Sequence, residues 1–161
     1  MRPAIYLAAL GGSGLTQSSV GPFLRVANVT PDIPLIVTAF LGLSRGPEIG
    51  CLTGFALGLI QDVAGGGFLG AQALTKAMVG FLVGLVGARF QISHPLVQIP
   101  GLVLLTVVEG LARYGLLRLA HFPAGLGDMM ALVVLPQALY NGFIGAAVVF
   151  GLSLIEMKKC A

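Results

Sequence analysis

Long apolar stretches alternate along the chain with short segments rich in proline, glycine and charged residues. These interruptions read GPFLRVANVTPD, SRGPE, GGGFLG, RFQISHP and HFPAGLGD. Proline and glycine end helices, whereas a run of roughly 20 apolar residues can cross a bilayer as one helix. The pattern therefore predicts six helices, over residues 3–21, 31–45, 47–64, 71–89, 95–120 and 127–156.

Composition places these helices in a membrane. Hydrophobic residues make up 57% of the 161 positions and charged residues 9%, whereas soluble domains carry about 25% charged residues. The connections between the predicted helices are too short to hold further domains. We therefore expect an all-α integral membrane protein, with one six-helix transmembrane domain over residues 1–161. The range 31–45 is short for a span, which fits a tilted helix or a locally thinned bilayer.

The basic residues predict the orientation of the helices. If the first helix starts in the cytoplasm, the cytoplasmic helix ends carry most of the positive charge, namely Arg2, Arg45, Arg89, Lys158 and Lys159. The opposite ends carry Arg25 and Arg118. Lysine and arginine favour the cytoplasmic side, so both termini are expected there. The net charge of +3 is explained by this topology and does not indicate binding to nucleic acid.

Small residues recur every four positions in three of the predicted helices. Such a stripe lets two helix backbones approach closely within a bilayer. The stripes consist of Ala4, Ala8 and Gly12 in the first helix, Gly50, Gly54 and Gly58 in the third, and Gly80 and Gly84 in the fourth. They fit either packing within the chain or an interface with a partner helix. The first-helix stripe is the best candidate for a partner interface.

Polar and ionisable side chains gather in the predicted outer half of the bundle. Such residues are costly inside a membrane and therefore suggest a function. The candidates are Asp62, Lys76, Glu109, Arg113, Gln137 and Asn141. Glu109 precedes Arg113 by four residues, which is the favourable order for an ion pair along one helix. The set fits either a paired network that fixes the helix register or a solvated cavity that opens outward.

Asp62 stands at the end of the third predicted helix, shortly before three consecutive glycines. We expect it to pair with Lys76 across the turn and to hold the third and fourth helices together. The glycines at 65–67 lack the lysine and serine or threonine of a phosphate-binding loop. They are typical of a tight turn that needs positive φ.

The sequence holds no recognisable set of catalytic residues. It contains no HExxH, no G-x-S-x-G, no P-loop and no cluster of cysteines and histidines. His94 and His121 fall at opposite faces of the predicted bundle, so they do not share a site. We therefore expect a protein that is not an enzyme, with no catalytic residues, bound metal or cofactor.

Residues 31–87, PDIPLIVTAFLGLSRGPEIGCLTGFALGLIQDVAGGGFLGAQALTKAMVGFLVGLVG, resemble the rod shape-determining MreD family. In that family a Pro-Asp opens the second helix, an Arg-Gly-Pro hairpin follows, and a G-x-x-x-G-x-x-x-G helix ends in an acid before a glycine-rich turn. The resemblance extends to QSSVGP after the first helix and LPQALYN in the last. Two features depart from the family pattern, namely GGSG in the first helix and Lys76 in the fourth.

The resemblance implies a non-catalytic protein of the bacterial inner membrane. It implies binding to the transmembrane helix and juxtamembrane region of MreC and, through MreC, a link to the RodA glycosyltransferase and its transpeptidase partner in sidewall peptidoglycan synthesis. Besides the lipid bilayer, MreC is thus the expected partner, and support of rod shape the expected function.

A second interpretation follows from a further resemblance. MreD proteins are similar to the substrate-binding subunits of energy-coupling-factor vitamin transporters, which also have six helices and a ligand pocket that opens outward. Those subunits dock through an Ala-x-x-x-Ala motif in their first helix, a spacing that Ala4 and Ala8 share. Against this alternative, the chain has no tryptophan for ligand stacking.

Overall fold

The computed structural model describes residues 30–66, 69–89, 95–121 and 125–160. Within these ranges all regular structure is helical, and no strand occurs. The predicted first helix over 3–21, with the small residues Ala4, Ala8 and Gly12, lies outside the described part of the chain. The count of six helices and the resemblance to transporter substrate-binding subunits therefore stay predictions.

The first three described helices form two successive hairpins, with bounds close to the predicted ranges. They are α2 (Ile33–Arg45), α3 (Pro47–Gly65) and α4 (Ala71–Arg89). Gly46 alone separates α2 from α3, and its φ of +94° allows so sharp a reversal. Gly66 ends α3 in the left-handed conformation with a φ of +62°. The glycine at 66 thus supplies the positive φ that the sequence predicts for this turn.

The remaining helices are α5 (Pro95–Leu119), α6 (Leu126–Met129), η1 (Met130–Val134) and α7 (Leu135–Cys160). The sequence predicts one regular helix over 127–156, whereas the structure has a π-helical turn, η1, between α6 and α7. The N–H of Leu135 donates to the carbonyl of Met130, five residues earlier. Pro136 follows at once, and proline has no N–H and displaces the carbonyl of the preceding turn, so the widened turn accommodates its ring.

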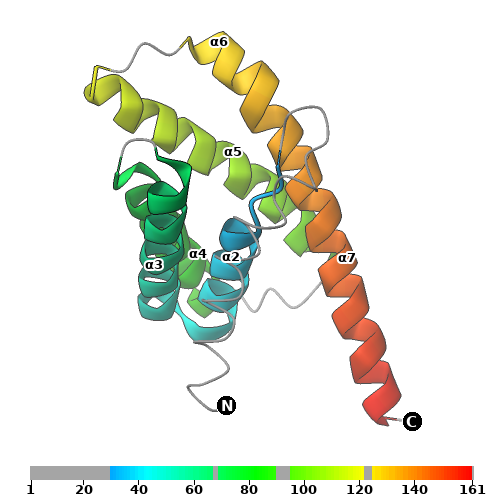
Figure 1. Cartoon of the computed structure of the whole chain (residues 1–161). Coiled ribbons are helices and arrows are strands. Elements are labelled where there is room, and N and C mark those ends of the chain that lie inside the picture. Colours follow the sequence, from blue (N-terminus) through cyan, green and yellow to red (C-terminus); the bar gives the residue numbers. More distant parts are fainter. Residues whose placement is uncertain (1–29, 67–68, 90–94, 122–124, 161) are drawn as a thin grey trace.

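The helices form two groups (Figure 1). Helices α2, α3 and α4 pack against one another as a compact bundle, which we call the α2–α4 group. Helix α5 packs along η1 and α7, and these elements with α6 form the α5–α7 group. Helix α5 runs diagonally across the upper end of the α2–α4 group in the view of Figure 1, and it contacts α4 there.

Glycines bring α3 and α4 into backbone contact. A methyl group on Gly50, Gly54 or Gly58 would overlap backbone atoms of α4 at Gly80, Lys76 and Ala73, respectively. A methyl group on Gly80 or Gly84 would likewise overlap the backbone at Gly50 or Pro47. The stripes of the third and fourth predicted helices therefore face each other within the chain.

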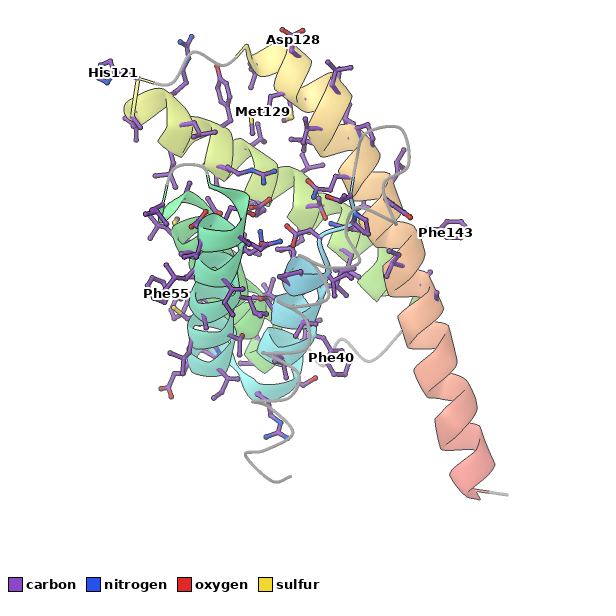
Figure 2. All side chains as sticks on the ribbon, viewed as in Figure 1. Phe40, Phe55, His121, Asp128, Met129 and Phe143 are labelled. Atoms are coloured by element: carbon purple, nitrogen blue, oxygen red, sulfur yellow. The ribbon has the colours of Figure 1, made fainter. Side chains whose placement is uncertain are left out.

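Many large apolar side chains point outward, while several charged side chains are buried. Phe143 is 81% exposed, Phe55 48% and Phe40 47% (Figure 2). By contrast Asp32, Lys76 and Glu109 are almost completely buried. By length and composition, Ala71–Arg89 and Leu126–Ala147 can each cross a membrane, and α2 is a shorter apolar helix. An apolar exterior around a polar interior suits a protein surrounded by lipid.

Candidate functional site

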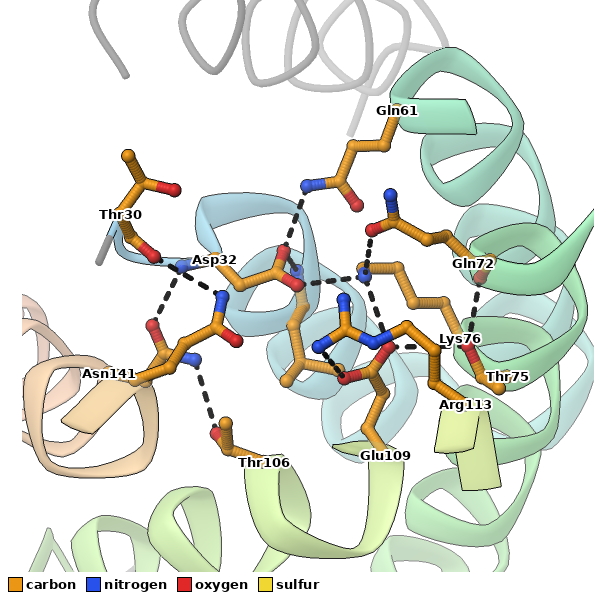
Figure 3. Close-up of polar contacts among 12 residues, drawn as sticks. Thr30, Asp32, Gln61, Gln72, Thr75, Lys76, Thr106, Glu109, Arg113 and Asn141 are labelled. Carbon is orange, nitrogen blue, oxygen red and sulfur yellow. Dashed lines mark hydrogen bonds and ion pairs between the residues drawn. The ribbon is translucent and has the colours of Figure 1, made fainter. Parts of the chain in front are cut away.

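Lys76 of α4 is the centre of a buried set of polar side chains (Figure 3). Its Nζ lies 2.8 Å from Oδ2 of Asp32 and 3.4 Å from Oε1 of Glu109. It also donates a hydrogen bond to Oε1 of Gln72, one turn earlier on α4, at 3.2 Å. Asp32 immediately precedes α2 and Glu109 lies on α5, so this one ammonium group joins three helices.

Asp32 has two functions at the start of α2. Its Oδ1 accepts the N–H of Leu35 at 3.1 Å, which caps the helix N-terminus. The same oxygen accepts a hydrogen bond from Nε2 of Gln61 on α3 at 3.1 Å. With Oδ1 facing these two donors, Oδ2 is left for Lys76. The helix cap thus fixes the position of the carboxylate that pairs with the Lys76 ammonium group.

Glu109 receives donors mainly on one of its two oxygens. Its Oε1 accepts from Oγ1 of Thr75 at 3.2 Å and from Lys76 at 3.4 Å. Its Oε2 lies 3.8 Å from Nη2 of Arg113, one turn later on α5. At that separation the two charges attract each other but form no hydrogen bond. The ion pair predicted along this helix is therefore present, with its hydrogen-bonding capacity unused.

Two amides attach α7 to this set. The N–H of Asp32 donates to Oδ1 of Asn141 at 2.8 Å, and Nδ2 of Asn141 donates to Oγ1 of Thr106 at 3.1 Å. Nε2 of Gln137 donates to the carbonyl of Thr30 at 3.2 Å. We call the connected side chains the polar network; they are Asp32, Gln61, Gln72, Thr75, Lys76, Thr106, Glu109, Arg113, Gln137 and Asn141.

The charges within the polar network balance. Asp32 and Glu109 contribute two negative charges, Lys76 and Arg113 two positive ones. The side chains of the first three are at most 2% exposed, and that of Arg113 is 16% exposed. Buried charges are tolerated when they are paired, whereas removing one partner leaves the other uncompensated at high cost. The network therefore joins the two helix groups at the lowest cost when its positive and negative charges balance.

The predicted pair of Asp62 and Lys76 is wrong. Asp62 instead accepts three backbone N–H groups at the start of α4, from Gly70 at 2.9 Å, Gln72 at 3.1 Å and Ala73 at 3.0 Å. The first N–H groups of a helix have no partner within it and carry partial positive charge. Asp62 thus caps α4 from the end of α3, and it holds the α3–α4 turn by a different contact from the one expected.

The structure brings together five of the six polar residues singled out in the sequence and leaves Asp62 apart. The sequence reasoning missed Asp32, which has the position of an ordinary helix cap after Pro31. It also missed Thr75 and Thr106, which lie within largely apolar helices. One signal for Asp32 was available. Lys76 needs a buried acid, and Asp32 is the acid at the predicted outer end of the second helix, at the same level as Lys76 in the fourth.

The polar network has the chemistry of a binding or structural site. Among the described residues no group of three or more histidine, cysteine, aspartate and glutamate side chains is arranged to hold a metal ion. The buried hydroxyls of Thr75 and Thr106 each donate within the network or to their own helix. What the network offers is hydrogen-bond donors and acceptors in a setting of zero net charge.

Comparison with known proteins identifies a matching family. The family model of the rod shape-determining protein MreD matches residues 6–158, which is nearly the whole chain. No curated protein and no solved structure matches the chain significantly.

Proposed function

The chain belongs to the MreD family and thus has a role in rod shape determination, and from this premise we propose that it is a non-catalytic scaffold of the bacterial cell-elongation machinery. In this proposal it lies in the inner membrane as a multi-pass protein with both termini in the cytoplasm. It binds the transmembrane helix of MreC and thereby supports peptidoglycan synthesis by RodA and its transpeptidase partner.

The observation that carries the proposal is the family match over residues 6–158. The exterior of the described helices supports it, because the exposed side chains are largely apolar and suit lipid and helix–helix contact. An assembly role is also consistent with a family of shape-determining proteins, whose name describes a structural task and no reaction.

The glycine packing narrows the surface that a partner helix can use. Gly50, Gly54, Gly58 and Gly80 contact backbone within the α3–α4 hairpin, so this stripe is already covered. Among the small-residue stripes of the sequence, that leaves Ala4, Ala8 and Gly12. We propose that MreC docks against this first-helix stripe, where small residues allow close approach.

The test is co-purification of the tagged chain from its native membranes in mild detergent, with mass spectrometry of the proteins recovered. We expect a bitopic protein with a periplasmic domain, together with cell-wall synthases. Recovery of a membrane coupling protein with paired ATPases would contradict the proposal and favour a vitamin transporter subunit.

A matched pair of variants tests the docking surface. Ala8→Leu places a bulky side chain within the stripe and would block close approach of a partner helix. We expect it to reduce the recovered MreC by about tenfold, which corresponds to about 1.4 kcal/mol of binding free energy. Ala9→Leu makes the same change one residue away, on a different face of the predicted helix, and should leave recovery unchanged. Equal recovery with both variants would remove this stripe from the proposal.

A further inference from the structure

The polar network contains buried groups whose hydrogen-bonding capacity is unused. Oε1 of Gln61, Oε2 of Glu109 and Oε1 of Gln137 have no hydrogen-bond partner, and neither do Nε and Nη2 of Arg113. Gln61 and Gln137 are 8% exposed and Glu109 only 1%. Buried polar groups are nearly always satisfied by protein, water or ligand, and in lipid the need is greater. These atoms therefore have unused capacity to bind a polar molecule.

The guanidinium group of Arg113 indicates that the bound molecule carries an acidic group. Its Nε and Nη2 hydrogens point in the same direction and form the fork that binds two oxygens of a carboxylate or phosphate. Both nitrogens of this fork are without a hydrogen-bond partner. The nearest acid, Glu109, has its Oε2 at 3.8 Å from Nη2, beyond hydrogen-bond range. The fork thus has unused hydrogen-bonding capacity of the kind that suits a carboxylate or phosphate group.

The remaining unpartnered atoms of the polar network, on Gln61, Glu109 and Gln137, are all acceptors. They require donors, and an ammonium group supplies three. The net charge of the network also favours a ligand with an ammonium group. Asp32, Glu109, Lys76 and Arg113 already sum to zero, so a purely anionic or cationic ligand would leave one buried charge uncompensated. An overall neutral ligand that carries both an acidic and an ammonium group avoids that cost.

We propose that the polar network binds a zwitterion, with its carboxylate or phosphate oxygens on the Nε–Nη2 edge of Arg113 and its ammonium group on the neighbouring free Oε2 of Glu109. Two sources supply this chemistry, a phosphoethanolamine lipid headgroup and a small water-soluble zwitterion. Arg113 is the member of the four charged side chains with appreciable exposed surface, while its Nε and Nη2 are buried, so in this proposal the ligand enters beside this side chain. The inference does not depend on the proposed scaffold function.

The experiment measures what the purified protein retains. The tagged full chain is purified in mild detergent, washed and denatured, and the phosphatidylethanolamine, phosphatidylglycerol and small amines released per protein are quantified by mass spectrometry. We expect one zwitterion per chain. Phosphatidylethanolamine above its membrane proportion identifies the lipid source, and a soluble amine identifies the other source. Phosphatidylglycerol, which is anionic, should not be enriched.

Two arginine variants on α5 provide the control. Arg113→Gln removes the fork, and we expect at least about a tenfold loss of retained zwitterion, because a charged bidentate contact contributes that much to binding. Arg118→Gln removes an exposed arginine whose Nε bonds Tyr114, and retention should not change. Three results would overturn the proposal: equal retention by both variants, enrichment of phosphatidylglycerol, or release of no zwitterion from wild type. The free groups would then be hydrogen-bonded to water.

A measurement on wild type alone covers the case in which Arg113→Gln does not fold. Delipidated protein in detergent is heated with added phosphatidylethanolamine, glycine or phosphatidylglycerol as probes. A ligand that binds only the folded state raises the unfolding midpoint. A rise with phosphatidylethanolamine or glycine that is absent with phosphatidylglycerol supports the proposal. A rise with phosphatidylglycerol alone, or no rise with any probe, contradicts it.

Discussion

Two interfaces within this molecule are built in opposite ways. Between α3 and α4, glycines such as Gly54 let backbone meet backbone, and the contact depends on the absence of side chains. Between the α2–α4 group and the α5–α7 group, long polar side chains span the space between helices, with Lys76 at the centre. The first interface is fixed by shape, the second by charge and hydrogen bonding.

The difference shows two solutions to one problem. In a bilayer there is little hydrophobic force between helices, because the lipid acyl chains around a helix are as apolar as the side chains of a neighbouring helix. Close packing and interhelical hydrogen bonds remain as the sources of attraction. The α3–α4 hairpin uses the first, and the junction of the two groups uses the second. The two interfaces should therefore respond to different substitutions.

The largest effect is expected from Lys76→Met, which removes the central charge and keeps the length of the side chain. Asp32 and Glu109 then face each other with only Arg113 to compensate them. Breaking a buried ion pair by removing one partner costs about 3–5 kcal/mol. The free energy of unfolding, measured by denaturing-detergent titration in mixed micelles, should fall by that amount. A loss below about 1 kcal/mol, the value of an exposed pair, would contradict the account.

A smaller loss is expected from Gly54→Ala, because its methyl group would overlap the backbone of α4 at Lys76. Overpacking of this kind costs about 1–3 kcal/mol, and here the obstacle is backbone that cannot rotate away. Gly115→Ala is the control, since no heavy atom lies within 4 Å of a methyl group at that position. The same titration should show a lower free energy of unfolding for Gly54→Ala and no loss for Gly115→Ala. Equal values for the two variants would mean that close α3–α4 packing does not contribute to the stability.

The smallest effect is expected from Asp62→Asn, which keeps one acceptor oxygen and removes the charge. Asp62 accepts from the N–H groups of Gly70, Gln72 and Ala73. Loss of a charged helix cap costs about 1–2 kcal/mol. Asp128→Asn, at an exposed acid in the first turn of α6, should change the unfolding titration less. If Asp62→Asn lowered the free energy of unfolding as much as Lys76→Met, the result would favour a pair of Asp62 and Lys76 and contradict the capping contact.

The sequence predicts the described helices well because proline and glycine mark their ends. Gly46 and Gly66 are glycines at positions of positive φ, and such positions are readable from local residue type. The π turn before Pro136 was not predicted, because a proline within an apolar run allows a kink, a break or a widened turn. Local rules thus place the ends of the helices but leave open how the chain adapts between them.

The polar network was predictable in part. Glu109 and Arg113 lie on one helix four residues apart, so their pairing follows from helix geometry. The partner of Lys76 depends on which helices are neighbours and on how each is rotated, and sequence spacing gives neither. The sequence predicts a pair of Asp62 and Lys76 because both lie near one turn, but the N–H groups at the start of α4 lie closer to Asp62 along the chain.

The most direct test of the account asks whether the charge of Lys76 is balanced by Asp32. Lys76→Met is combined either with Asp32→Asn or with Asp62→Asn, and the free energy of unfolding is measured in mixed micelles. Asparagine keeps the helix cap at 32 and restores zero net charge, so we expect the first double variant to be more stable than Lys76→Met alone. The second should be less stable, with roughly additive losses. Rescue by Asp62→Asn, or no rescue by Asp32→Asn, would contradict a charge-balanced network.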